Sequence, residues 1–358
     1  MSIKNARQRA RKTGAMKLDT LTKEISVPLR LVVEGYRRQL RRLHPYESVV
    51  ADLTVRTLEK SGGATLAEVL EEVKKLHKEV VATGKAHASR AKRASTAAEA
   101  TDILEIGSDE VLGIMGRPNS VTVLLEMLEI QKALQRVPVV ELSTPTIVLV
   151  GAPNVGKSSI IRAISTGTPE VNNYPFTTRG VTIGHMFEER GGCLVGDRGA
   201  ARYQIMDTPG VLARKDDVRN EMESLTIASM QHLPTAVMFV VDLSGVSGNE
   251  KSSIEDQCLV RRELRERFPR RPWVDVISKA DLDEQPGALD IFKDAVAEVD
   301  QKTSCNSGSD AVDAILQVSV KSGEGIDALD TRVRELLFSV EKVLQAYAQT
   351  YRKAEEEA

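Results

Sequence analysis

The 358-residue sequence has few aromatic residues, few cysteines and no long apolar run. Aromatic residues make up 4% of it, and Trp occurs once. The longest apolar stretches, such as "AVMFVV" at 236–241, have the length of a β-strand and are much shorter than a membrane span. The sequence therefore predicts a protein with no membrane partner.

The three cysteines, Cys193, Cys258 and Cys305, are far apart and do not have the spacing of metal ligands. This distribution argues against a disulfide-stabilised scaffold and against a zinc site built on cysteine. It indicates reduced thiols in a reducing compartment.

No proline occurs between Pro45 and Pro118, and this part of the chain has a helical pattern. In "TLAEVLEEVKKLHKEVV" (65–81) the apolar residues fall on one helical face, and Thr65 with Glu68 forms a capping box. We expect residues 21–140 to form a bundle of about four helices.

The net charge of −2 is unevenly distributed. Residues 1–18 carry six basic side chains and no acidic one, whereas the chain ends in "EEEA". We treat residues 1–20 as a separate basic arm with three readings: the remnant of an organelle-targeting segment, an arm along nucleic acid phosphates, or a solvated tail. The sequence does not separate them.

After Pro138 the pattern changes to short β-rich runs separated by helical stretches. These runs are "TIVLVG" (146–151), "RYQIMD" (202–207), "AVMFVVD" (236–242), "WVDVIS" (273–278) and "LQVSV" (316–320). They predict an α/β domain at 141–345 with a mostly parallel sheet and helices on both faces. A long last helix should start near Gly325, and 346–358 should be its projecting end with an acidic tail.

The stretch "GAPNVGKSS" (151–159) is a P-loop preceded by a strand and followed by a helix. Its glycines, including Gly156, let the backbone N–H groups of the loop point at phosphates, which Lys157 also reaches. The Ser158 hydroxyl is expected to bind Mg²⁺. The nucleotide-contacting set at this loop is Asn154, Val155, Gly156, Lys157, Ser158 and Ser159.

The stretch "SKAD" (278–281) resembles the guanine motif of GTPases. The Asp281 carboxylate can accept hydrogen bonds from guanine N1–H and the N2 amine, which adenine lacks, and Lys279 should pack over the base. Ser278 stands where that motif has asparagine, and this shortens the polar arm. Ser319, Val320 and Lys321 then close the base pocket after the last strand.

Two further stretches, "NNYPFTTRGVTIGH" (172–185) and "DTPG" (207–210), have the form of the two switches of a GTPase. Asp207 should hold Mg²⁺ through water, and the Gly210 amide should face the γ-phosphate. Thr178 is the predicted switch threonine that completes the magnesium site, with Thr177 as the alternative. Both switches should be ordered by the γ-phosphate and loosened on hydrolysis.

With these elements in order, the chain resembles the Obg-related GTPases and, more closely, the nucleolar GTP-binding protein 1 family. The G domain carries this resemblance in "NYPFTTRGVTIGH" (173–185), "DTPGVL" and "AVMFVVDLSGVSG" (236–248). "LHPYESVVADLTV" (43–55) and "GKAHASRAKRA" (84–94) extend it to the helical region.

The resemblance implies an assembly factor of the large ribosomal subunit that binds maturing rRNA in its GTP state and leaves after hydrolysis. Its partners would be large-subunit rRNA with ribosomal proteins or other assembly factors, and it would act as a monomer. The short C-terminus and the pI of about 6.3 differ from the nucleolar members. We therefore expect a plastid or mitochondrial protein, with the nucleolus or cytoplasm as alternatives.

Residue Val211 occupies the position where Ras-like GTPases have the glutamine that orients water. Its side chain cannot form hydrogen bonds, so intrinsic hydrolysis should be slow. Asn154 resembles the asparagine of potassium-stimulated GTPases, so we expect K⁺ and the ribosomal precursor to stimulate turnover. The other reading of Asn154 is a turn residue that caps the loop. The expected catalytic set is thus Lys157, Thr178, Gly210 and Asn154.

Basic side chains gather in two stretches. In 84–94, Lys85, Arg90, Lys92 and Arg93 occur with no acid, which favours rRNA phosphates. In "RRELRERFPRR" (261–271) acids are interspersed, so a solvated surface helix is expected. His87 and His185 show no carboxylate partner in the sequence and are read as structural or RNA-facing.

Two other classes of function compete with the assembly factor. One is a GTPase acting in tRNA modification or translation, which would need a further domain. The other is a scaffold that binds nucleotide without hydrolysing it, against which the predicted Lys157, Ser158, Thr178 and Asp207 argue.

Overall fold

The computed structural model describes residues 3–60, 62–137, 140–167, 169–172, 181–188, 201–212, 219–246, 253–303 and 315–356. Its contacts divide the chain into two units. The helical unit consists of residues 1–44 and 51–136, and the GTPase unit consists of residues 45–50 and 137–358. Each unit is described by itself.

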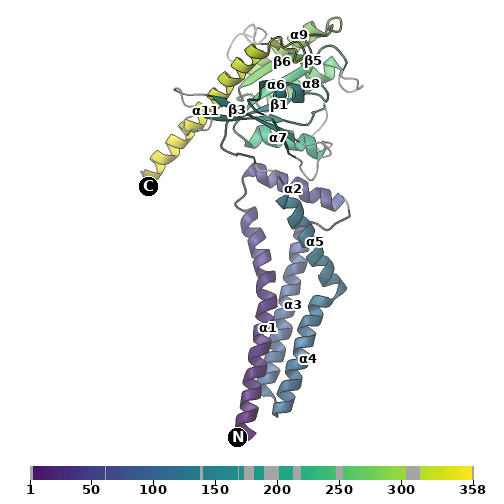
Figure 1. Cartoon of the computed structure of the whole chain (residues 1–358), viewed down its shortest axis with the longest axis vertical. Helices are drawn as coiled ribbons and strands as arrows, with labels where there is room; N and C mark the ends of the chain where they lie inside the picture. The colour runs from purple at the N-terminus through teal and green to yellow at the C-terminus, as the bar shows by residue number, and fades with distance from the viewer. Residues whose placement is uncertain are drawn as a thin grey trace. The chain divides into compact units, whose positions relative to one another are not determined.

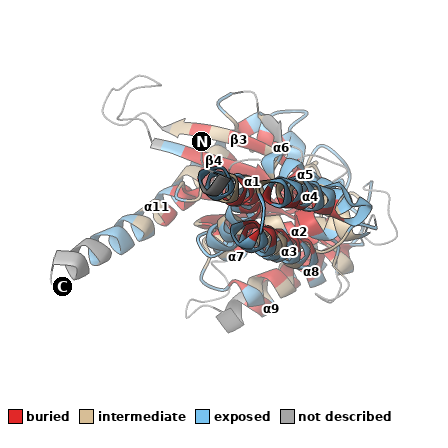
Figure 2. Cartoon of the chain, turned by 90° about the horizontal axis from the view of Figure 1, so that it is seen from below, coloured by how far each residue is buried: buried red, intermediate tan, exposed pale blue. Residues whose placement is uncertain are grey.

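The helical region contains five described helices, not about four. They are α1 (Ile3–Leu40), α2 (Pro45–Lys60), α3 (Leu66–Arg93), α4 (Ala97–Gly116) and α5 (Pro118–Gln135). Long helices α1, α3 and α4 pack side by side with their buried residues turned toward one another (Figure 2), and α5 packs on α3. The predicted capping box at Thr65 and Glu68 is confirmed at the start of α3.

Residues 3–20, expected as a separate basic arm, are the first half of α1. Ala15 and Leu18 are buried in a core cluster with Ala88 and Ala91 of α3. The Arg11 guanidinium also donates a hydrogen bond to the Ala94 carbonyl at 2.5 Å. The expectation of an arm was wrong because apolar residues among the cations fix this segment to the bundle.

Helices α1 and α3 approach closely where α3 has glycine. A Cβ atom built on Gly84 would lie 1.9 Å from the Thr22 Oγ1 atom and 2.7 Å from its Cγ2 atom. Thr22 is buried, and its hydroxyl donates to the Leu18 carbonyl at 2.7 Å. The close contact therefore depends on glycine at position 84.

The GTPase unit is built on a seven-stranded sheet in the order β2-β3-β4-β1-β5-β6-β7 (Figure 1). The strands are β1 (Thr146–Val150), β2 (Glu170–Asn172), β3 (Val181–Glu188), β4 (Ala201–Asp207), β5 (Thr235–Asp242), β6 (Trp273–Ser278) and β7 (Leu316–Gln317). Strands β4, β1, β5, β6 and β7 are parallel, which confirms the predicted fold class. The antiparallel strands β2 and β3 were not predicted.

The helices of this unit are α6 (Lys157–Ile164), α7 (Glu221–His232), α8 (Ile254–Arg267), α9 (Ala288–Thr303) and α11 (Ile326–Glu356). One core cluster joins Ile147 and Leu149 of β1 to Ile160 of α6 and to Leu329 and Val333 of α11. Every residue of β5 is buried, as expected for a central parallel strand covered on both faces.

The last helix, α11, extends away from the core of its unit, and Tyr347 on it is 64% accessible (Figure 2). Among the described residues, no helix has the length and apolar character needed to cross a membrane.

Candidate functional site

The P-loop lies between β1 and α6, in contact with β5. A Cβ atom on Gly151 would lie 2.2 Å from the Val240 carbonyl oxygen, so only glycine fits there. Asn154 and Gly156 have positive φ angles of 64° and 97°, which curl the loop over the start of α6. The backbone N–H groups at this helix start can therefore converge on an anion.

Lys157, the first residue of α6, is buried beneath this loop. Its ammonium group donates hydrogen bonds to the carbonyls of Gly151, at 3.1 Å, and Ala152, at 2.7 Å. Burial lowers the pKa of Lys157 to about 8, although the nearby charge of Asp207 acts in the opposite direction. A bound phosphate chain would supply the negative charge that favours the protonated form.

The Ser158 hydroxyl and the Asp207 carboxylate are in direct hydrogen-bond contact. Burial raises the pKa of Asp207, and the Ser158 hydrogen bond partly counters this. Hydroxyl and carboxylate oxygens are ligands that Mg²⁺ prefers, so the pair fits the predicted magnesium site. Thr178 and Thr177 lie outside the described residues, and no group of three His, Cys, Asp or Glu side chains among those described could hold a metal.

The segment after β4 is held against the P-loop. The Thr208 hydroxyl donates to the Leu149 carbonyl at 2.6 Å, and the Val211 N–H donates to the Gly151 carbonyl at 3.1 Å. A Cβ atom on Gly210 would lie 2.5 Å from the Pro153 nitrogen, so the close approach requires glycine. The Val211 side chain is fully buried, so it does not reach a water molecule in the site.

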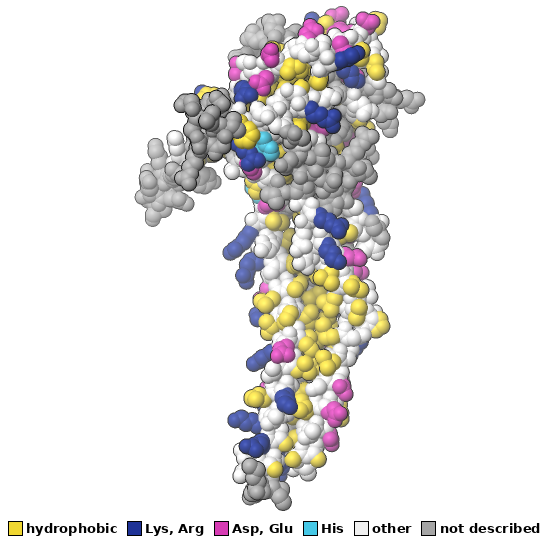
Figure 3. Space-filling view, in the orientation of Figure 1, with side chains coloured by type: hydrophobic (Ala, Val, Ile, Leu, Met, Phe, Trp, Pro, Cys, Tyr) yellow, Lys and Arg dark blue, Asp and Glu magenta, His cyan; other side chains and the backbone are white. Residues whose placement is uncertain are grey.

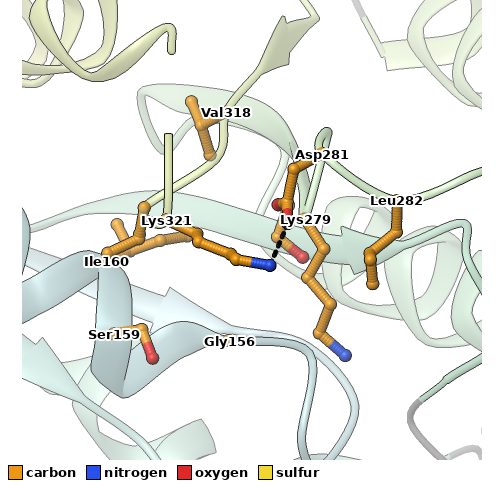
Figure 4. A pocket seen from close by; sticks show the side chains of 10 residues that line it. Gly156, Ser159, Ile160, Lys279, Asp281, Leu282, Val318 and Lys321 are labelled. Atoms are coloured by element: carbon orange, nitrogen blue, oxygen red, sulfur yellow. Dashed lines mark ion pairs between the residues drawn. The ribbon is translucent and has the colours of Figure 1, made fainter. Parts of the chain in front are cut away.

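A cleft of about 430 Å³ opens beside the P-loop (Figure 4). Its lining residues come from α6, from the ends of β6 and β7 and from the segments after these strands: Gly156, Ser159, Ile160, Ser278, Lys279, Asp281, Leu282, Val318, Val320 and Lys321. The cleft thus brings together part of the predicted set, and the predicted residues that do not line it are Asn154, Val155, Lys157, Ser158 and Ser319.

At this cleft Asp281 is held by its neighbours. Its carboxylate accepts a hydrogen bond from the Ser319 hydroxyl at 2.6 Å and lies 3.9 Å from the Lys321 ammonium group (Figure 4). The Ser319 hydrogen bond lowers the pKa of Asp281, which therefore stays ionised at neutral pH. An ionised carboxylate has about four lone-pair sites, so beside the Ser319 hydrogen bond it can accept two N–H donors from a ligand.

The Ser278 hydroxyl has a role that comparison with the asparagine of the guanine motif did not predict. Its hydroxyl contacts the Val155 carbonyl of the P-loop at 2.6 Å and the Val241 carbonyl of β5 at 3.0 Å. One short side chain thus links the phosphate loop to the ends of two strands.

Asp242 is a site residue that the sequence analysis missed. Its fully buried carboxylate pairs with the Lys279 ammonium group at 2.5 Å and accepts from the Ser244 hydroxyl at 2.6 Å. Lys279 has a positive φ of 57°, so the ion pair stabilises an unusual backbone at the cleft. The signal was available, because Asp242 ends β5 opposite Ser278 of β6 in the parallel register.

The structural reading of His87 is confirmed, whereas the expectation of a solvated surface helix at 261–271 is wrong at Arg261. His87 is buried and its Nε2 atom contacts the carboxylate of Glu110 on α4, a partner that only packing of α3 on α4 creates. Arg261, expected on a solvated helix, is fully buried and forms a two-pronged ion pair with Asp275 at 2.8 and 2.7 Å. His185 Nε2 lies 2.9 Å from the Arg202 guanidinium.

Residues 1–141 match the family described as the NOG1 N-terminal helical domain, and residues 146–279 match the family described as 50S ribosome-binding GTPase. Nucleolar GTP-binding protein 1 of Arabidopsis thaliana is 29% identical over 212 residues, which cover 58% of this chain and 29% of that protein. The protein of that name from Encephalitozoon cuniculi is 35% identical over 159 residues, covering 44% and 28%.

A crystal structure from Plasmodium falciparum, whose description names nucleolar GTP-binding protein 1, is 24% identical with a TM-score of 0.43. It covers 61% of this chain and 100% of that chain. The chain matches less than a third of the length of the two relatives named above. Through its helical domain and its P-loop domain together, the chain belongs to the nucleolar GTP-binding protein 1 family of GTPases.

Proposed function

We propose that this chain binds and slowly hydrolyses GTP and assists assembly of the large ribosomal subunit, binding maturing rRNA in the GTP state. The observation that carries the proposal is the cleft in which Asp281, Lys279 and Gly156 meet. A carboxylate there accepts from guanine, and the adjoining P-loop accepts phosphates.

The residues of the phosphate site divide the work of hydrolysis. Lys157 and the loop N–H groups bind the β- and γ-phosphates and stabilise the charge that develops on them. Ser158 and Asp207 would hold Mg²⁺, which neutralises phosphate charge when bound. Gly210 approaches Pro153 of the loop closely, and its amide is suited to detect the γ-phosphate.

Slow turnover follows from the buried Val211, because no side chain at this position orients the attacking water. Asn154 is exposed on the P-loop and is our candidate for holding K⁺ beside the phosphates. Stimulation by K⁺ and by the ribosomal precursor would then raise a low basal rate.

Binding to rRNA is supported by the basic character of the helical unit, where Lys85 and Lys92 are exposed on α3. The relatives' names include the word nucleolar, which fits the nucleolar alternative and lends no support to a plastid or mitochondrial location.

The test has two parts and uses the full chain. Single-turnover hydrolysis should be slow but measurable, and it should be lost in Lys157→Ala. Co-sedimentation with immature large subunits should occur with a non-hydrolysable GTP analogue and not with GDP.

Binding of nucleotide without any hydrolysis would favour the scaffold alternative. Association with tRNA or with mature ribosomes in place of immature subunits would favour the tRNA-modification or translation alternative.

A further inference from the structure

Cations are arranged along one edge of the helical unit. On α1, Lys12, Lys23, Arg30 and Arg37 are exposed, and they are separated by intervals of eleven and seven residues. Such intervals return to the same side of a helix within about 20°. These four side chains therefore form one stripe along α1.

A second stripe runs along α3. Lys74, Lys78, Lys85 and Lys92 follow one another at intervals of four and seven residues, so they too share one side of their helix. Lys78, Lys85 and Lys92 are exposed and Lys74 is half-buried.

Two ion pairs show that the stripes face the same groove. Lys92 lies 3.9 Å from Asp19 of α1, and Arg37 lies 3.8 Å from Glu71 of α3. These contacts lie near opposite ends of α3, and along α1 they lie near its middle and its C-terminal end, so the stripes stay side by side between Asp19 and Arg37. We name the eight cations of both helices the basic track.

The basic track has an excess of positive charge. The acidic side chains on it are Asp19, Glu34 and Glu71, so eight cations face three carboxylates. Between Lys12 and Arg37 the rise of the helix gives the track a length of about 37 Å. A strand of a nucleic acid duplex places about ten phosphates along such a length.

A shallow cleft continues the track at the end of α1. Its volume is about 380 Å³ and it is lined by Arg37, Arg38, Arg41, Arg42 and Glu34. Arginine forks bind phosphate oxygens in pairs, so this cleft is suited to a phosphate group.

One face of the helical unit shows both cations and apolar side chains. Dark blue side chains project along the left edge of the helical unit in Figure 3, whereas the middle of the face turned to the viewer is apolar. Exposed Leu31 of α1 and Leu125 and Leu128 of α5 are among the apolar residues of the unit. On this face, phosphate binding is thus favoured at the edge over the apolar middle (Figure 3).

The track offers no aromatic platform for stacking bases. Helix α3 contains no Phe, Tyr or Trp, and the single one of α1, Tyr36, packs against the core cluster of the bundle. Proteins that bind single strands without sequence preference use aromatic side chains for stacking. Double-stranded RNA is recognised by shape and by its phosphates and 2′-hydroxyls.

We infer that the basic track of α1 and α3 binds the phosphate backbone of an RNA helix, a double-stranded segment, without reading its sequence. The inference rests on the proposed rRNA-binding function and narrows it to one surface. It also divides the basic stretch 84–94: Lys85 and Lys92 belong to the track, whereas Arg90 projects from another side of α3.

The test measures binding of the full chain to an RNA duplex of about 20 base pairs and arbitrary sequence, over a range of salt concentrations. The track variant changes Lys12, Lys23, Lys78 and Lys85 to Gln, four lysines that form no ion pair with any described residue. The matched control changes Lys17, Arg90, Lys132 and Arg136, which lie off the track, to Gln.

The track variant should bind the duplex about tenfold more weakly or worse at moderate salt, with the salt slope reduced by about one per lost contact. The control should lose less than about threefold. Equal losses in both variants, or tighter binding of a single strand than of the duplex by the unaltered protein, would overturn the inference. GTP-dependent co-sedimentation with immature subunits tests the proposed function separately. The inference about the basic track and the proposed function can therefore fail independently.

Discussion

The two units of the chain build their surfaces in different ways. In the GTPase unit, residues far apart in the sequence meet where parallel strands end, and partners hold each of them: Ser278 on Val155, Lys279 on Asp242, Asp281 on Ser319. In the helical unit, the candidate surface is a repeated charge pattern on two exposed helix sides. A site of the first kind should be sensitive to single substitutions, whereas one of the second kind should weaken gradually.

The largest effect is expected from one carboxylate of the GTPase unit. Asp281→Asn should lower GTP affinity about 10²- to 10⁴-fold, because two charge-assisted hydrogen bonds to guanine are lost, and it should favour xanthine nucleotides. Asp283→Asn is the matched control, since Asp283 is exposed and outside the cleft lining. Titration with GTP and with XTP measures the two affinities. Unchanged GTP preference in Asp281→Asn would contradict the assignment of Asp281 to the guanine base.

A substitution in the helical unit tests the same comparison between the two units. Gly84→Ala should destabilise the packing of α1 on α3 by about 1–3 kcal/mol, because the new Cβ atom would overlap Thr22. Gly35→Ala, whose Cβ atom would have no neighbour within 4 Å, should be neutral or stabilising.

Hydrogen exchange of the α1 and α3 amides reports this loss directly, with GTP affinity as the reference. Faster exchange in Gly84→Ala with unchanged GTP affinity supports the view that the GTP site does not depend on the packing of α1 on α3. Similar exchange in the two glycine variants would contradict the packing argument.

A smaller effect tests whether the P-loop compensates for the apolar Val211. We expect hydrolysis to be about tenfold faster in KCl than in NaCl, a part of the stimulation that an arginine finger provides. Asn154→Ala should abolish the difference and leave binding of GDP nearly intact. Equal rates in the two salts would leave Asn154 with the role of a turn residue.

The smallest effect concerns pH. The pKa of Lys157 is lowered to about 8, so the free protein loses this charge as the pH rises above that value. Phosphate binding favours the charged form, so GTP affinity should be nearly constant well below pH 8 and fall about five- to tenfold between pH 7 and pH 9. In Lys157→Arg the guanidinium stays charged, so a persisting fall would assign it to another group.

Much of the GTPase unit was predictable because its motifs are local and their order along the chain is fixed. Ser158 and Asp207 were expected at one metal site and are in contact, and Gly156 and Asp281 were expected at one nucleotide and line one cleft. Asp242 was missed because its role becomes visible only when the ends of the two predicted strands 236–242 and 273–278 are placed side by side.

The helical unit was less predictable because its contacts depend on how helices pack. The partner of His87 lies 23 residues away on α4, and the burial of Ala15 and Leu18 on α1 needs α3 beside them. Periodicity located the apolar faces of the helices. Periodicity also places Lys85 and Arg90 on different sides of α3, but it did not show which neighbouring helix each side meets.

The most direct test of the account is the relative affinity of the full chain for GTP and ATP, measured by equilibrium titration in the presence of Mg²⁺. Two charge-assisted hydrogen bonds at Asp281 predict that GTP binds at least about 100-fold more tightly than ATP. Equal affinity for the two nucleotides, or no binding of either, would contradict the central claim that this cleft is a guanine-nucleotide site.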